Sequence, residues 1–287
     1  GNFEGKNILI ESKNKLNEEE QNKIAEIENK LFLERKKRIK PFFDDKSQTD
    51  LNAYILDTLL NASIVLEDNN LKNETITTFK LLNDKLSNKI YHCYNSNEID
   101  VFLEDYVYYA KLLVTLYEVD EDKQALEKSI TILKEIWEIF YNKDTQLLQK
   151  NRIKQNDLFV SPIDLNDNNI PNGNSVYLNL CNKIYTITND KFWFYKVEIL
   201  KKSFHQILNS FYSQMFSFIK NLDLIEDNIS FTFYGDDVLY KKEKKKLLQS
   251  FFGRATFIYK IEDSSNSGVV ICNKQICSNK KSGYMLS

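Results

Sequence analysis

Three short clusters of acidic, amide and hydroxyl side chains stand at the starts of segments with helical periodicity. The first is Phe43-Asp44-Asp45-Lys46 with Asp50 and Asn52 behind it, and the second is Phe102-Leu103-Glu104-Asp105-Tyr106. The third is Asp164-Leu165-Asn166-Asp167, which leads into Pro171-Asn172-Gly173-Asn174-Ser175. Carboxylate pairs across a cleft suit glycoside hydrolysis, in which one acid protonates the leaving oxygen and the other acts as base or nucleophile. They also suit plain sugar binding, and the same residue types are ordinary helix N-caps.

Within these clusters, the carboxylates are the candidate catalytic residues: Asp44, Asp45, Glu104 and Asp105. The other polar or small residues are candidates for ligand binding: Lys46, Asn52, Tyr106, Asp164, Asp167, Gly173, Asn174 and Ser175. If the helices behind the clusters are parallel, the three clusters meet at one rim, where positive helix dipoles flank a cleft.

Other catalytic chemistries find little support in the sequence. His92 and His205 are the only histidines, too few for a usual zinc triad, and each is better explained as a partly buried polar residue. No GxSxG or HExxH motif occurs. Cys272 and Cys277 flank a predicted turn and are expected to be free thiols, while Cys93 and Cys181 fall in predicted helices. We therefore expect no metal and no cofactor.

The composition narrows the class of protein. The 287 residues carry 39 Lys and Arg against 41 Asp and Glu, without the basic excess of a nucleic-acid binder. Only 7 Gly and 3 Pro argue against folds built from many tight turns. No membrane span and no secretory signal are expected, and four Cys in so long a chain favour a reducing, cytoplasmic compartment.

The elements that position the clusters are mainly helices. Apolar periodicity predicts helices over 17–38, from Asp50, over 73–87, from Asp100, over 122–141, 174–188 and 190–212, with a short one at 212–221. The basic residues that end the first, 35–38, suit a helix C-terminus better than a nucleic-acid patch. Leu147-Leu148 and Leu158-Phe159-Val160 are expected to form a small hairpin in an irregular insertion at 142–172.

The helices starting near 50, 101 and 174 each precede an amphipathic partner. This repeat favours a toroid of helical hairpins whose inner helices begin on the same rim, although an open α-solenoid also fits. The fold class predicted for residues 1–225 is thus mainly α, an incomplete (α/α) toroid of helical hairpins. Residues 226–287 are expected to form a small β-α-β-β subdomain, its first two strands parallel.

Five motifs resemble the YyaL-like, spermatogenesis-associated thioredoxin-domain proteins. Residues 2–9 resemble the family's NFEGKNIL segment, 43–46 with Asn52 its LDDK…TxWNGL motif, and 102–106 its FLDDYA motif. Residues 171–176 resemble PSGNSV, and 270–277 resemble the terminal YVCRxxxC. The resemblance covers nearly the whole chain.

The resemblance implies a six-hairpin glycosidase-like toroid preceded, in the family, by a thioredoxin-like domain that this chain lacks. The chain departs from the family at the rim: Leu51-Asn52-Ala53 stands for Trp-Asn-Gly, Phe42 for a His, and 160–164 keeps only the Pro and Asp of RPKD. Because the missing groups are basic or aromatic, the family's activity transfers poorly, and fold alone does not fix function.

Two functional hypotheses follow. The first is a domain of carbohydrate-active ancestry that binds or acts on a sugar-like small molecule at the rim. The second is a non-catalytic scaffold that completes a toroid with a partner chain or with a missing N-terminal region. Neither hypothesis involves nucleic acid or a membrane.

Overall fold

The computed structural model describes residues 1, 4–5, 8, 16–94, 100–152, 161–235, 238–251, 253–260, 268–274 and 276–278. The chain divides into two compact units, Gly1–Asp45 and Lys46–Ser287. The first contains helix α1 (Glu18–Lys36), where Asn17 and Glu20 form a capping box. Most of the NFEGKNIL-like segment, and Leu158-Phe159-Val160, lie outside the described residues.

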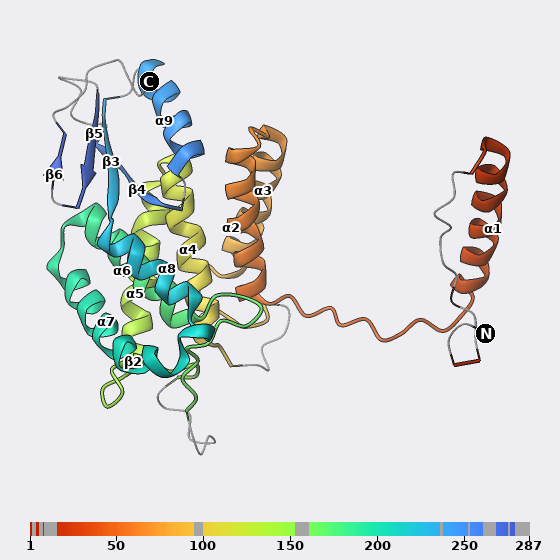
Figure 1. The fold of residues 1–287 in the computed structure, drawn as a ribbon, viewed down its shortest axis with the longest axis horizontal. Helices are drawn as coiled ribbons and strands as arrows, with labels where there is room; N and C mark the ends of the chain where they lie inside the picture. Colours follow the sequence, from red (N-terminus) through yellow and green to blue (C-terminus); the bar gives the residue numbers. More distant parts are fainter. Residues whose placement is uncertain are drawn as a thin grey trace. The chain divides into compact units, whose positions relative to one another are not determined.

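The second unit is built from helical hairpins, as the periodicity predicts (Figure 1). Each hairpin has one helix facing the neighbouring hairpins and one outer helix. They are α2 (Thr49–Val65) with α3 (Asn69–Lys85), α4 (Leu103–Asp120) with α5 (Lys123–Phe140), and α6 (Gly173–Thr188) with α7 (Lys191–Phe211). A 3₁₀ turn, Tyr212–Gln214, leads to α8 (Phe216–Glu226), which packs on α6. The predicted mainly helical fold is confirmed.

Helix α4 is the centre of this arrangement. It contacts α2 on one side and α6 on the other, and almost every residue from Leu103 to Val119 is buried. Its partner α5 is strongly amphipathic and buries one stripe against it. Because one helix is surrounded by the others, the residues at its two ends are held rigidly, and both ends carry polar groups.

The predicted hairpin in the 142–172 insertion has a different partner strand. Leu147–Leu148 (β2) pairs antiparallel with Tyr141–Asn142 (β1), the residues that directly follow α5. The turn is closed by Asn142, whose Oδ1 accepts from the backbone N–H groups of Asp144 and Thr145. Both leucines of β2 are buried, which places the insertion against the hairpins.

The C-terminal α/β part has the predicted topology. Strand β3 (Ile229–Tyr234) leads through α9 (Val238–Phe251) to β4 (Ala255–Lys260), which pairs with it in parallel. Strand β5 (Gly268–Asn273) pairs antiparallel on the other side of β3, and β6 (Ile276–Cys277) is at the edge. Its aromatic core is separate from that of the hairpins. Two cores agree with a subdomain boundary near 226, which itself stays a prediction.

This sheet lies at the C-terminal end of α4. Tyr117 belongs to the sheet's core, and the Tyr259 hydroxyl donates to the Glu118 carbonyl. Glu118 also accepts from the Phe257 backbone N–H, at 3.4 Å. Because the sheet packs on the C-terminal end of α4, it does not cover the N-terminal end, where the predicted rim would lie.

Two predictions about cysteines are wrong. Cys272 and Cys277, expected to be free thiols, face each other in the β5–β6 register and form a disulfide. Cys93, expected in a helix, lies in an isolated bridge with Gln48. The position of Cys93 was mispredicted because pairing between distant segments is not visible in local periodicity.

Among the described residues, no helix combines the length and apolarity that crossing a membrane requires. The cytoplasmic compartment stays a prediction.

Candidate functional site

The N-termini of α2, α4 and α6 meet, as the sequence predicts. The Asp50 backbone N–H, in the first turn of α2, donates to Asp105 Oδ1 on α4 at 3.3 Å. On the other side of α4, the Glu104 carboxyl reaches the start of α6, because a Cβ placed on Gly173 would lie 3.0 Å from Glu104 Oε1. Three helix starts therefore share one rim.

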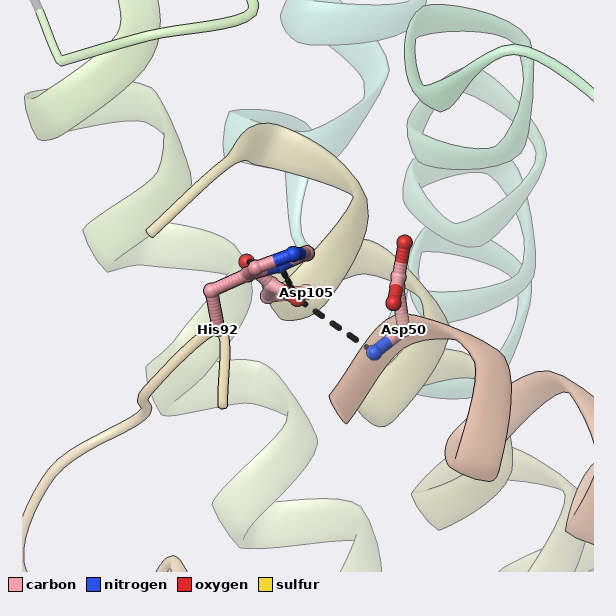
Figure 2. A group of neighbouring side chains, drawn as sticks. All are labelled: Asp50, His92 and Asp105. Atoms are coloured by element: carbon pink, nitrogen blue, oxygen red, sulfur yellow. Dashed lines mark hydrogen bonds and ion pairs between the residues drawn. The ribbon is translucent and has the colours of Figure 1, made fainter. Parts of the chain in front are cut away.

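Asp105 is the fully buried centre of this rim (Figure 2). Its Oδ2 accepts from the Phe102 backbone N–H at 2.8 Å, which is half of a capping box at the start of α4. Its two oxygens lie 3.0 and 3.1 Å from His92 Nδ1. Backbone donors and an imidazole thus surround the carboxylate.

His92 comes from the segment that leads toward α4. The chain there is fixed to the start of α2, because the Thr49 N–H donates to the His92 carbonyl and the Thr49 hydroxyl to the Tyr91 carbonyl. Phe102 packs edge-on against the ring. His92 Nε2 lies 3.1 Å from Gln48 Nε2, so the amide donates to it and the ring proton sits on Nδ1, facing Asp105. This is the geometry of a histidine oriented by a carboxylate.

Glu104 lies beside Asp105 with a different environment. Its Oε2 is buried and has no hydrogen-bond partner among the described residues. Burial raises the pKa of this carboxyl, and the nearby charges of Asp164 and Asp105 raise it further. An acid that keeps its proton at higher pH than an ordinary glutamate is suited to donate it.

The third cluster builds the wall on the α6 side. Asn172 caps α6 by accepting from the Ser175 N–H, and Asp167 holds Asn172 and Ser217 in place. The buried Asn174 side chain accepts from the Leu148 N–H and donates to the Leu148 carbonyl, fixing β2 to the start of α6. These contacts form the scaffold of the rim.

A cavity of about 350 Å³ opens at this rim. Carboxylates, amides, a lysine and aromatic rings line it: Asp50, Leu51, His92, Phe102, Glu104, Lys150, Asp164, Asn166, Asn168, Asn169, Ile170, Pro171 and Asn172. Its volume lies within the range of small-molecule sites. The Lys150 ammonium stands 5.9 Å from the centre of the Phe102 ring. The cavity therefore offers donors, acceptors and an aromatic surface together.

Burial and neighbouring charges also shift the pKa of two other groups at the cavity, Asp50 and His92. Burial raises the pKa of Asp50, and the charge of Asp105 adds to the effect. The hydrogen bond to Asp105 raises the pKa of His92, and burial opposes that shift. One wall thus carries a protonatable imidazole and another carries Glu104, the pairing that acid–base chemistry requires.

Asp50, His92 and Asp105 also have the side-chain types of a metal site, with ligand atoms within 4.8 Å of one another. However, His92 Nδ1 and both oxygens of Asp105 are already engaged in hydrogen bonds. The contacts therefore describe a hydrogen-bonded histidine–aspartate pair. The expectation of no metal remains a prediction.

The structure distributes the predicted site residues unevenly. Glu104 and Asp164 line the cavity, and Asp105 and Gly173 support it from behind. Lys46 is exposed ahead of α2, and Asn52 donates to the Gln48 carbonyl in its own helix.

Four other predicted residues face the interior or the scaffold. Tyr106 packs on Phe140, Asp167 binds Asn172 and Ser217, and Asn174 and Ser175 are fully buried. Asp44 and Asp45 are exposed and belong to the unit Gly1–Asp45, so their part in a site stays a prediction.

Sequence reasoning missed most of the residues that line the cavity, and His92 and Lys150 are the two basic ones among them. Neither belongs to a polar cluster ahead of a helix. His92 reaches the rim through its pairing with the start of α2, and Lys150 through its carbonyl, which accepts from the Leu103 N–H. Of the residues that line the cavity, Asp50 was the easiest to place at the rim from the sequence, because it lies in the first turn of a predicted helix behind the first cluster.

Comparisons with known proteins give structural neighbours only. No protein-family profile matches the chain, and no curated protein sequence matches it. The α-1,6-mannanase GH76A of Salegentibacter sp. HEL1_6 is similar in structure, with a TM-score of 0.44 and 12% identity over 66% of this chain. Inactive variants of that enzyme, bound to α-1,6-mannotriose or α-1,6-mannotetrose, have the same score and identity. The chain spans 54% of the length of these mannanase chains.

Proposed function

We propose that the rim cavity binds a carbohydrate-like small molecule. The observation that carries the proposal is the convergence of the carboxyls of Asp50, Glu104 and Asp164 with several asparagine amides around one cavity. A polyol needs alternating donors and acceptors, which carboxylates and amides supply together. The Phe102 ring adds an apolar surface for the C–H face of a sugar.

The same geometry supports chemistry on the bound ligand. Glu104, with its raised pKa, is the group to donate a proton to a leaving oxygen. His92, oriented by Asp105, is the group to accept one through Nε2 once Gln48 gives way to ligand or water. Membership of the YyaL-like family is part of the proposal, because its rim motifs supply Glu104, Asp105 and the 171–176 segment.

Calorimetric titration tests the binding proposal. A panel of mono- and disaccharides, with α-1,6-mannotriose as a further probe, is titrated into wild type, Glu104→Gln and Asp164→Asn. We expect saturable binding of at least one saccharide, weakened about tenfold in each variant, because a hydrogen bond to a charged group is worth about 1.5–3 kcal/mol. Glu127→Gln, on an exposed position of α5, is the matched control and should bind like wild type.

No saccharide binding, or equal binding by wild type and both rim variants, would remove the proposal. A second candidate, the scaffold, is favoured by exposed apolar side chains on α2 and α8, among them Ile55 at 54% and Phe216 at 66% exposure. It predicts a stable assembly by light scattering that Ile55→Lys and Phe216→Lys disrupt. A monomer at all concentrations would count against it.

A further inference from the structure

A second cavity, of about 180 Å³, lies between the inner helices. Four helices contribute to its wall: α2, α4, α6 and α8. Of the residues that line the rim cavity, only Pro171 also lines this one. We call it the inner cavity, and it is independent of the proposed function.

Two acid–lysine pairs stand in the wall of the inner cavity. Lys111 Nζ on α4 lies 2.5 Å from Asp57 Oδ2 on α2, and Lys183 Nζ on α6 lies 2.7 Å from both oxygens of Glu118. Both carboxylates are nearly inaccessible to solvent. Lys220 on α8 also lines the cavity. The lining therefore carries three lysine ammonium groups and two carboxylates.

Each carboxylate already accepts hydrogen bonds from a lysine and from a second donor of the wall. Asp57 Oδ1 accepts from the Thr115 hydroxyl at 2.6 Å and Oδ2 from Lys111. Glu118 accepts the two bonds from Lys183 and one from the Phe257 N–H. The charge of each acid is therefore balanced by a lysine of the same wall.

Unused donors, by contrast, face the inner cavity. Lys111 has three N–H donors and gives one to Asp57. In the part of the chain that the structure describes, Lys220 and the Asn179 amide make no hydrogen bond or ion pair. Donors without acceptors, and a net positive charge, are the conditions for holding an oxyanion.

We propose that the inner cavity binds an oxyanion, a phosphate or carboxylate group, through Lys111, Lys220 and Asn179. The group could be a free anion or the charged end of a larger molecule, since both present the same oxygens. Apolar residues also line the cavity: Val114, Val176, Leu180 and Leu224. They lower the polarity around the anion, and charge-assisted hydrogen bonds are strengthened in such a surrounding.

Titration with inorganic phosphate at constant ionic strength tests this proposal. Lys220 is exposed, so Lys220→Gln removes a donor without opening a buried ion pair. We expect saturable binding of one phosphate per chain and about tenfold weaker binding in Lys220→Gln. Asn179→Leu, similar in volume, should weaken binding in the same direction and leaves Lys111 paired with Asp57.

Lys202→Gln, an exposed lysine of α7 outside the lining, is the matched control and should stay within twofold of wild type. Glu104→Gln should leave phosphate binding unchanged, because it alters only the rim. The proposal is overturned if wild type shows no saturable binding, if Lys220→Gln and Lys202→Gln weaken it equally, or if only Glu104→Gln weakens it.

A parallel titration with a hexose phosphate and the unphosphorylated hexose separates the two sources of the anion. A hexose phosphate that competes with phosphate and binds more tightly supports the charged end of a sugar. Phosphate binding without competition from the hexose phosphate supports a free anion.

Discussion

At the scale of single residues, Glu104 is the most informative group. One of its carboxyl oxygens is buried without a partner among the described residues, in a helix start where Asp105 accepts from the Phe102 backbone N–H. Such a group costs folding free energy, and proteins retain it where it serves a purpose. The chemistry of the rim and the stability of the fold are therefore linked at this residue.

We predict that Glu104→Gln stabilises the protein at neutral pH by on the order of 1 kcal/mol. Burial raises the folded-state pKa of Glu104, so its favourable protonated form is fully present below the unfolded-state pKa. That contribution is lost as the pH rises through the folded-state pKa. Urea unfolding at pH 4 and pH 8 should show the gain at pH 8 alone.

The exposed Glu127→Gln serves as the control here too, and it should change the free energy of unfolding by less than about 0.5 kcal/mol at either pH. A destabilised Glu104→Gln at pH 8 would mean that the carboxylate is ionised and well paired.

Residue chemistry could be predicted from the sequence only where it coincided with a helix start. Glu104 and Asp164 stood out because they precede or begin apolar helices. His92 did not, since nothing local shows that its carbonyl accepts from the Thr49 N–H. Asn174 was predicted to bind ligand, but its side chain bonds the backbone of β2, a contact between distant segments that local sequence does not show.

At the scale of elements, the first residue of α6 determines how closely the Glu104 side chain of α4 packs against α6. Gly173 is its first residue, and a Cβ there would lie 2.9 Å from Leu103 Cδ2 and 3.0 Å from Glu104 Oε1. The backbone of Gly173 is helical, so its conformation does not require glycine. Glycine is required there because α4 approaches too closely for a side chain. Alanine usually stabilises such a position, and here it should not.

We predict that Gly173→Ala destabilises the protein by about 1–3 kcal/mol and weakens saccharide binding, because the methyl group must displace Leu103 or Glu104. Thermal unfolding and calorimetry measure the two effects. Ser175→Ala, two residues along α6, is the matched change. Its buried hydroxyl has no partner among the described residues, so the variant should be neutral or more stable.

Equal stability of Gly173→Ala and wild type would show that α4 and α6 tolerate a wider spacing, and the tight contact would then have no role in the site. The start of α6 was predictable from Asn172 and Gly173, whereas the contact with α4 was not, because periodicity describes a helix without its neighbours.

At the scale of the whole chain, hairpins and sheet were predictable because their patterns are long and regular. The β3–α9–β4 unit followed from strand periodicity and the handedness of crossovers. The disulfide was missed because free thiols are the usual state in a reducing compartment.

The disulfide makes a direct prediction about thiol content. Denatured, unreduced protein should contain two titratable thiols, Cys93 and Cys181, and reduced protein four. Closing so short a loop is worth about 2 kcal/mol at most. Reduction should therefore loosen the β5–β6 edge and leave helical circular dichroism unchanged. Four reactive thiols before reduction would contradict the bond.

The central claim is that the cavity at the starts of α2, α4 and α6 is the ligand site. Backbone NMR spectra of the protein, recorded with and without a saccharide that binds in the calorimetric panel, test it most directly. We expect the largest shift changes at Phe102–Tyr106, Asp164–Asn172 and His92, and in Glu104→Gln we expect the same changes only at about tenfold higher saccharide concentration. Changes confined to the sheet, the inner cavity or α1 would contradict the claim.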